Sequence, residues 1–169
     1  MYQKIDLKKR FHPLNMPECQ PALKKEKGKL LIFDPVSRQW RRLTPEEWVR
    51  QHVLVYLMEH KQVPRTRISV EKNQTSHSVK AKVRYDVSIW SNTHNAPLCL
   101  VECKAPYVEL HEGNFSQTGL YFKPSSMVGL WLTNGIEHQF LIWDHATRGY
   151  IKHSHLPTYA AMEALQSER

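Results

Sequence analysis

Two stretches decide the fold, Val83-Arg-Tyr-Asp-Val-Ser-Ile-Trp90 and Leu98-Cys-Leu-Val-Glu-Cys-Lys104, joined by seven mainly polar residues. Apolar and β-branched side chains recur at every second position, which predicts two strands, and the segment between them has the composition of a hairpin loop. A loop centred on His94 places Asp86 opposite Glu102, each eight residues from that centre. Directly opposed residues have Cβ atoms about 5 Å apart, so we expect these carboxylates to lie side by side.

Lys104 follows Glu102 by two residues and therefore lies on the same face of its strand. Such a trio could be a surface ion cluster, a metal-free acid and base pair, or a site for a hard cation. No neighbouring residue suggests a sugar site or a nucleophile, which disfavours the second interpretation. Adjacent carboxylates repel each other unless a positive charge lies between them. The cation site, with Mg²⁺ or Mn²⁺, therefore fits best, and phosphodiester hydrolysis is its natural chemistry.

The spacing Asp86, fifteen residues, then Glu102-Cys103-Lys104 resembles the PD-(D/E)xK nuclease motif, with Tyr85 where that motif has proline. A longer series of segments resembles the N-terminal nuclease domain of type I restriction enzyme R subunits: Thr44-Pro-Glu-Glu-Trp-Val-Arg-Gln51, Val101-Glu-Cys-Lys-Ala-Pro106 and Leu132-Thr-Asn-Gly135. The resemblance implies an α/β fold, a restriction-endonuclease-like mixed β-sheet flanked by helices (α/β/α). It also implies a Mg²⁺-dependent DNA endonuclease, a hydrolase of phosphodiesters.

The same resemblance implies roles for the residues of the motif. Asp86, Glu102 and the main-chain carbonyl of Cys103 would bind one or two Mg²⁺ ions, with Mn²⁺ as a substitute. Lys104 would orient or activate the attacking water and neutralise charge on the phosphate.

A further metal ligand is implied on the first helix, which we predict from the N-cap Thr44 to about His60. Glu46 lies one turn before Val49 and points along the apolar stripe, whereas Glu47 completes a capping box with Thr44. Both glutamates remain candidates at this point.

Gln117 and Tyr121 match a QxxxY pattern of related nucleases, and a helix over Val108–Tyr121 would place both on one face. By resemblance, Gln117 would position Lys104 or the phosphate, with support from Tyr121. Asn134-Gly135 predicts a type I′ turn, and Pro157–Gln166 predicts a terminal helix. The remaining apolar runs predict further strands: Lys29–Phe33, Gln39–Leu43, Arg67–Lys72, Ser126–Thr133, Gln139–Trp143 and Gly149–Lys152.

Positive charge is concentrated near the N-terminus. The formal net charge is +8, of which residues 1–42 carry eleven Lys/Arg against four Asp/Glu. We expect a basic N-terminal arm over 1–28, extended and without a strand up to Lys27, and a nuclease-like domain over 29–169. The arm either contacts a DNA backbone or is a solvated tail.

A non-catalytic DNA-binding or assembly module that kept the fold is the alternative function. The expected partners are DNA and, by resemblance, restriction-modification subunits or a helicase in trans. The chain contains no Gly-x-x-x-x-Gly-Lys-Ser/Thr loop, so we do not expect it to hydrolyse nucleotides by that route. Neither a long apolar run nor a signal peptide is visible, so we expect a cytoplasmic protein with no membrane partner.

Overall fold

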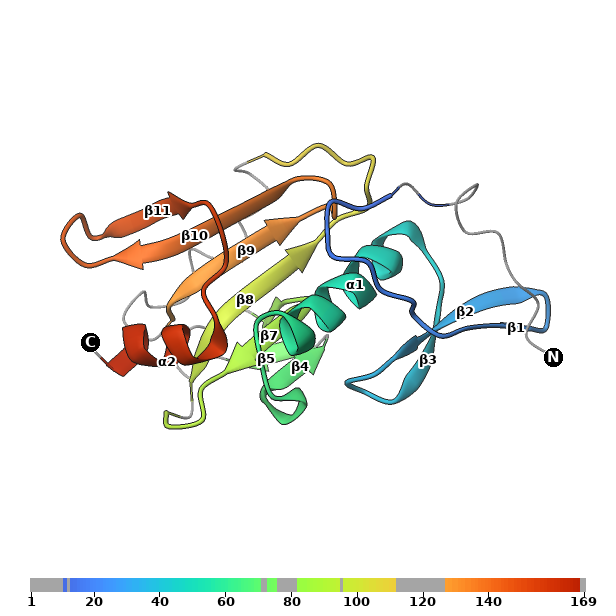
Figure 1. The fold of residues 1–169 in the computed structure, drawn as a ribbon, viewed down its shortest axis with the longest axis horizontal. Helices are drawn as coiled ribbons and strands as arrows, with labels where there is room; N and C mark the ends of the chain where they lie inside the picture. The colour runs from blue at the N-terminus through green and yellow to red at the C-terminus, as the bar shows by residue number, and fades with distance from the viewer. Residues whose placement is uncertain are drawn as a thin grey trace.

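The computed structural model describes residues 11, 13–70, 73–75, 82–94, 96–111 and 127–167, and of 73–75 and 82–84 it describes only the backbone. Its centre is a six-stranded mixed sheet in the order β11-β10-β9-β8-β7-β4 (Figure 1). Strands β8 and β9 are parallel, and the other neighbours are antiparallel. The bounds are β4 Ile68–Val70, β7 Val87–Trp90, β8 Pro97–Cys103, β9 Gly129–Thr133, β10 His138–Asp144 and β11 Gly149–His153.

The central hairpin has the register that the sequence predicts, since Val87 lies opposite Val101 and Ser88 opposite Leu100. The first strand, however, is not continuous over 83–90. It divides into β6 (Lys82–Arg84), which pairs with β5 (Asn73–Thr75), and β7, with Asp86 at the break. The N–H of Cys103, which a longer ladder would pair with a main-chain carbonyl, instead donates to Asp86 Oδ2 at 2.7 Å.

Helix α1 (Pro45–Glu59) confirms the predicted first helix. Thr44 is its N-cap in extended conformation, and the Glu47 N–H donates to Thr44 Oγ1 at 3.1 Å, which satisfies one of the free donors of the first turn. Four apolar side chains on one side of the helix are buried: Val49, Val53, Leu54 and Leu57.

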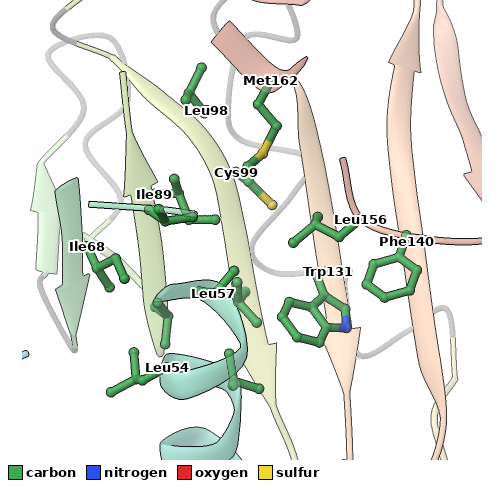
Figure 2. Close-up of a cluster of buried hydrophobic side chains, with 14 of the residues drawn as sticks. Leu54, Leu57, Ile68, Ile89, Leu98, Cys99, Trp131, Phe140, Leu156 and Met162 are labelled. Carbon is green, nitrogen blue, oxygen red and sulfur yellow. The ribbon is translucent and has the colours of Figure 1, made fainter. Parts of the chain in front are cut away.

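A short 3-10 helix, η1 (Arg65–Arg67), precedes β4. The two α-helices of the described residues, α1 and α2 (Tyr159–Ser167), pack on the same face of the six-stranded sheet (Figures 1 and 2). Their side chains share one core with alternate residues of the strands, and Trp131 lies buried within it. The members labelled in Figure 2 are Leu54, Leu57, Ile68, Ile89, Leu98, Cys99, Trp131, Phe140, Leu156 and Met162. The α/β class is confirmed, because a mixed sheet is covered by helices that bury its apolar residues.

A second, smaller cluster lies on the other face of the sheet, made by Tyr85, Leu100, Met127 and Leu130. The helix predicted over Val108–Tyr121 does not begin at Val108, because Val108–His111 is irregular. The remainder of that segment, with Gln117 and Tyr121, lies outside the described residues.

The loop between β9 and β10 is not the predicted type I′ turn. Thr133 pairs with His138, so four residues connect the strands, and a positive φ occurs at Gly135 but not at Asn134. The Asn134 side chain shapes the loop, because its Oδ1 accepts the N–H groups of Ile136 and Glu137.

A separate three-stranded antiparallel sheet precedes α1, made of β1 (Leu23–Glu26), β2 (Lys29–Asp34) and β3 (Gln39–Arg42). The β2–β3 hairpin confirms the prediction, but β1 falls where the sequence predicts an extended arm. Strand β1 forms because its backbone pairs with that of β2 along its whole length, from Leu23 opposite Ile32 to Glu26 opposite Lys29. No helix in the described part of the chain is long and apolar enough to cross a membrane.

Candidate functional site

The carboxyl end of β8 brings two residues of the predicted site together. Lys104 Nζ lies 2.6 Å from Glu102 Oε1, and both side chains are only partly exposed, at 26% and 20%. Tyr85 lies on the sheet face opposite the helices, where burial raises its pKa and the nearby Tyr150 and Glu102 raise it further. Glu102 therefore lies on that face, as the period-two alternation from Leu100 requires.

Asp86 lies at the neighbouring strand end and has its own partners. Its Oδ2 accepts the Cys103 N–H, and its Oδ1 lies 3.2 Å from Nη1 of Arg50. Continuing the β7–β8 register by one residue places Asp86 opposite Glu102. The strand end thus positions the backbone of both acids, whereas a helix residue holds the carboxylate of Asp86.

Arg50 joins α1 to this strand end. Its side chain is 6% exposed, its Nη2 donates to Glu47 Oε2, and its Nε lies 3.4 Å from Glu47 Oε1. Gln51 also donates to Glu47 Oε1, at 2.7 Å. A buried carboxylate needs such partners, because removing a charge from water without compensation is costly.

The two candidate glutamates of α1 therefore have different surroundings. Glu47 is buried and engaged by Arg50 and Gln51. Glu46 is exposed on the first turn of α1. Partial desolvation raises its pKa, the negative charge of Asp86 raises it further, and the positive charge of Lys104 lowers it. Glu46 is thus the glutamate of α1 that is electrostatically coupled to both Asp86 and Lys104.

The carboxylates repel one another across the site. Burial raises the pKa of Glu102, and the charges of Asp86 and Glu46 raise it further, against the hydrogen bond from Lys104. Burial would lower the pKa of Lys104, but its hydrogen bond to Glu102 and the nearby acids outweigh burial and raise it. Glu46, Asp86 and Glu102 therefore form one coupled acidic group, partly neutralised by Lys104 and Arg50.

Cys103 contributes to the site through its backbone. Its thiol is fully buried, and burial together with the charge of Asp86 raises its pKa well above 9.0. The thiol is therefore a neutral core group and unsuited to ligate a metal. The main-chain carbonyl remains the atom through which Cys103 could act.

Arg50 is the residue of this site that the sequence interpretation missed. It lies three residues after Glu47 and four after Glu46, and these are the spacings at which opposite charges meet on a helix. Arg50 is the only Lys or Arg of α1, and a single cation at these spacings from two acids is a signal that could have identified it.

The donor chemistry at this strand end fits a hard divalent cation, because three carboxylates and a carbonyl supply only oxygen. Within the described ranges, however, no three His, Cys, Asp or Glu side chains are grouped closely enough to hold a metal ion. Asp86 is paired with Arg50 and Glu102 with Lys104. A cation bound here would share these carboxylates with Arg50 and Lys104, because each carboxylate has about four acceptor sites.

Comparison with known proteins yields one family. The model of a family described as type I restriction enzyme R protein N terminus matches residues 45–157, which includes α1 and all six strands of the central sheet. No curated protein matches the chain.

Proposed function

The chain belongs to the type I restriction enzyme R protein N-terminal family, and from this membership we propose that it is a Mg²⁺-dependent DNA endonuclease. The carrying observation is the coupled acidic group at the end of β8, in which the charge of Asp86 raises the pKa of both Glu46 and Glu102. Repelling carboxylates next to a lysine are what a site for a divalent cation and a phosphate requires.

Asp86, Glu102 and the Cys103 carbonyl would hold the Mg²⁺, with Glu46 as the supporting glutamate. The ion would supply the Lewis acidity that phosphodiester hydrolysis needs near neutral pH. Glu47 has a different role in this proposal, because its carboxylate is occupied by Arg50 and Gln51.

Lys104 would hold the scissile phosphate and the attacking water by donating hydrogen bonds from its ammonium group. Its contact with Glu102 at 2.6 Å keeps the side chain over the strand end, so that little conformational freedom is lost when a phosphate arrives. Arg50 would position Asp86 from the protein side. Gln117 and Tyr121, which lie outside the described residues, stay as predicted helpers of Lys104 or the phosphate.

A second candidate, a DNA-binding or assembly module without catalysis, is favoured by a specific observation. Each acid of the motif already has a cationic partner, because Asp86 pairs with Arg50 and Glu102 pairs with Lys104. Ion pairs of this kind neutralise the acids without a metal. In either case we propose that the chain works on DNA together with the other subunits of a restriction system, as its family implies.

Cleavage of plasmid DNA by wild-type protein and by Asp86→Asn separates the two functions. We expect the wild type to cut with Mg²⁺ or Mn²⁺ and not with EDTA, and the variant to lose cleavage while its circular dichroism is unchanged. Asp144→Asn is the matched control, because Asp144 is the last residue of β10 and lies at the end of the sheet away from the carboxyl end of β8. It should cut like the wild type.

Metal binding gives a second measurement that does not depend on finding the right DNA. A saturating Mg²⁺ concentration, on the order of 100 times Kd, should stabilise the wild type by about 2.7 kcal/mol. The shift in melting temperature should be absent in Asp86→Asn and present in Asp144→Asn. A wild type with neither a shift nor cleavage would contradict the nuclease and leave the non-catalytic module.

A further inference from the structure

We propose that the outward face of the β1–β2–β3 sheet binds single-stranded DNA, with Lys24, Lys29 and Arg42 on the phosphates and Trp40 and Phe33 against the bases. We call these five residues the platform. The proposal deepens the proposed function and rests on it for DNA as the partner. The platform lies before residue 45, where the family match begins, so membership in the family does not itself predict it.

The strand register assigns the two faces of this small sheet. Lys24 lies opposite Leu31, which lies opposite Arg42, and Phe33 lies opposite Trp40. Directly paired residues share a face, and alternate residues along a strand do so too. The platform therefore lies on one face.

The other face of the sheet is directed inward. Ile32 and Asp34 on β2 are both fully buried, and α1 is in contact with this strand. Asp34 fixes the β2–β3 turn by accepting the N–H groups of Val36 and Ser37 and pairing with Arg41 at 2.8 Å. The hairpin is thereby held with its aromatic and basic face outward.

Charge on this element is strongly positive. Residues 23–42 contain seven Lys/Arg and two Asp/Glu, and one of these acids, Asp34, is buried with its own arginine. Glu26 is the remaining acid, 3.5 Å from Lys24. Surfaces of this composition bind polyanions by releasing counterions from phosphates.

The aromatic residues favour a single strand over a duplex. Trp40 is 37% exposed, its ring centroid is 5.3 Å from that of Phe33, and Lys24 Nζ lies 4.7 Å from the Trp40 centroid. Exposed rings combined with cations stack unpaired bases, whereas the base faces of a duplex are already stacked.

The platform is also close in sequence to Glu46, a member of the acidic group. Strand β3 ends at Arg42, and Glu46 follows four residues later on the first turn of α1. Four residues reach at most about 14 Å. A DNA strand held on the platform would therefore be within a few nucleotides of Glu46, which is electrostatically coupled to Asp86.

Fluorescence anisotropy with the full chain, in EDTA so that cleavage is impossible, tests the proposal. The probes are a labelled oligonucleotide and its duplex, over a range of salt concentrations. Lys29→Gln/Arg42→Gln removes two platform charges, and Arg65→Gln/Lys152→Gln removes two exposed charges elsewhere. We expect the first pair to weaken single-strand binding on the order of tenfold and reduce the salt slope by roughly 1.4, because each phosphate contact contributes about 0.7. The control pair should change binding little.

Trp40→Leu separates stacking from charge. We expect it to weaken binding of the single strand on the order of tenfold and to leave binding of the duplex nearly unchanged. Equal losses in the two double variants, or no binding by the wild type, would overturn the platform. A duplex preference with a neutral Trp40→Leu would overturn the assignment to a single strand. If the wild type binds single-stranded DNA as expected but does not cleave DNA with Mg²⁺, the result contradicts the nuclease proposal and leaves the platform proposal intact.

Discussion

Arg50 Nη1 lies 3.2 Å from Asp86 Oδ1, so one guanidinium joins the second turn of α1 to the strand end that carries the acids. The same side chain donates to the buried carboxylate of Glu47. The bridge thus connects the helix to the central hairpin across 36 residues of sequence. It neutralises two carboxylates that the hydrophobic core could not otherwise accommodate.

Arg50→Met should lower the free energy of unfolding by about 3–5 kcal/mol, because it leaves Glu47 buried without its cation. Adding Glu47→Gln should recover part of this loss, since the uncompensated charge is then removed. Urea unfolding at neutral pH measures both variants. Equal or greater destabilisation in the double variant would show that Arg50 contributes by packing rather than by charge.

Lys104→Met should reduce DNA cleavage by roughly 100-fold or more, the usual cost of losing one donor to a developing charge. Its pair with Glu102 is partly exposed, at 26% and 20%, so the free energy of unfolding should change by less than about 1 kcal/mol. Initial cleavage rates and urea unfolding check the two parts. Lys152→Met, an exposed lysine on β11, is the matched control and should retain the wild-type rate.

The lowered pKa of Glu163 on α2 predicts that the free energy of unfolding depends on pH. Burial alone would raise its pKa, but hydrogen bonds from the Asn92 N–H and the Ser91 hydroxyl outweigh burial and lower it below 4.5. A lowered pKa stabilises the fold at pH values above that of the unfolded glutamate, and this contribution is lost as pH falls through the folded pKa.

Glu163→Gln should therefore destabilise the protein at pH 7 by about 1.5–3 kcal/mol, the range for hydrogen bonds to a charged group. The difference from the wild type should shrink as the pH falls below about 4.5. Unfolding at several pH values measures it. Glu109→Gln removes a carboxylate that is 81% exposed and should show no comparable pH dependence; a similar profile would refute the role of Glu163.

Gly135→Ala should destabilise the fold by roughly 1–3 kcal/mol. Gly135 has φ +83, and an added Cβ would lie 2.8 Å from Leu14 Cδ2 and 3.1 Å from Val49 Cγ2. Gly149→Ala is the matched control, because a Cβ there would meet nothing closer than 3.9 Å. Thermal unfolding compares the two, and equal melting temperatures would contradict the argument.

Local rules predicted most of the framework correctly. The Thr44 cap, the apolar stripe of α1 and the alternation in the central hairpin depend on residues close in sequence, so they can be read without the tertiary fold. The same rules failed at β1, because Leu23–Glu26 has no alternation of apolar and polar residues and forms a strand by pairing with β2. They also failed at the Asn134–Glu137 loop, whose length is set by the pairing of Thr133 with His138.

The residue order alone is enough to bring Asp86, Glu102 and Lys104 to one end of the central hairpin, because strand alternation and loop symmetry fix which residues face each other. Which cation each acid pairs with depends on the folded arrangement of helix and sheet. The packing of α1 on the sheet brings Arg50 to Asp86. It also leaves Glu46 near the acids of the strand end, while Glu47 is buried against Arg50. Such long-range charge pairing follows from how a helix docks, which no local pattern encodes.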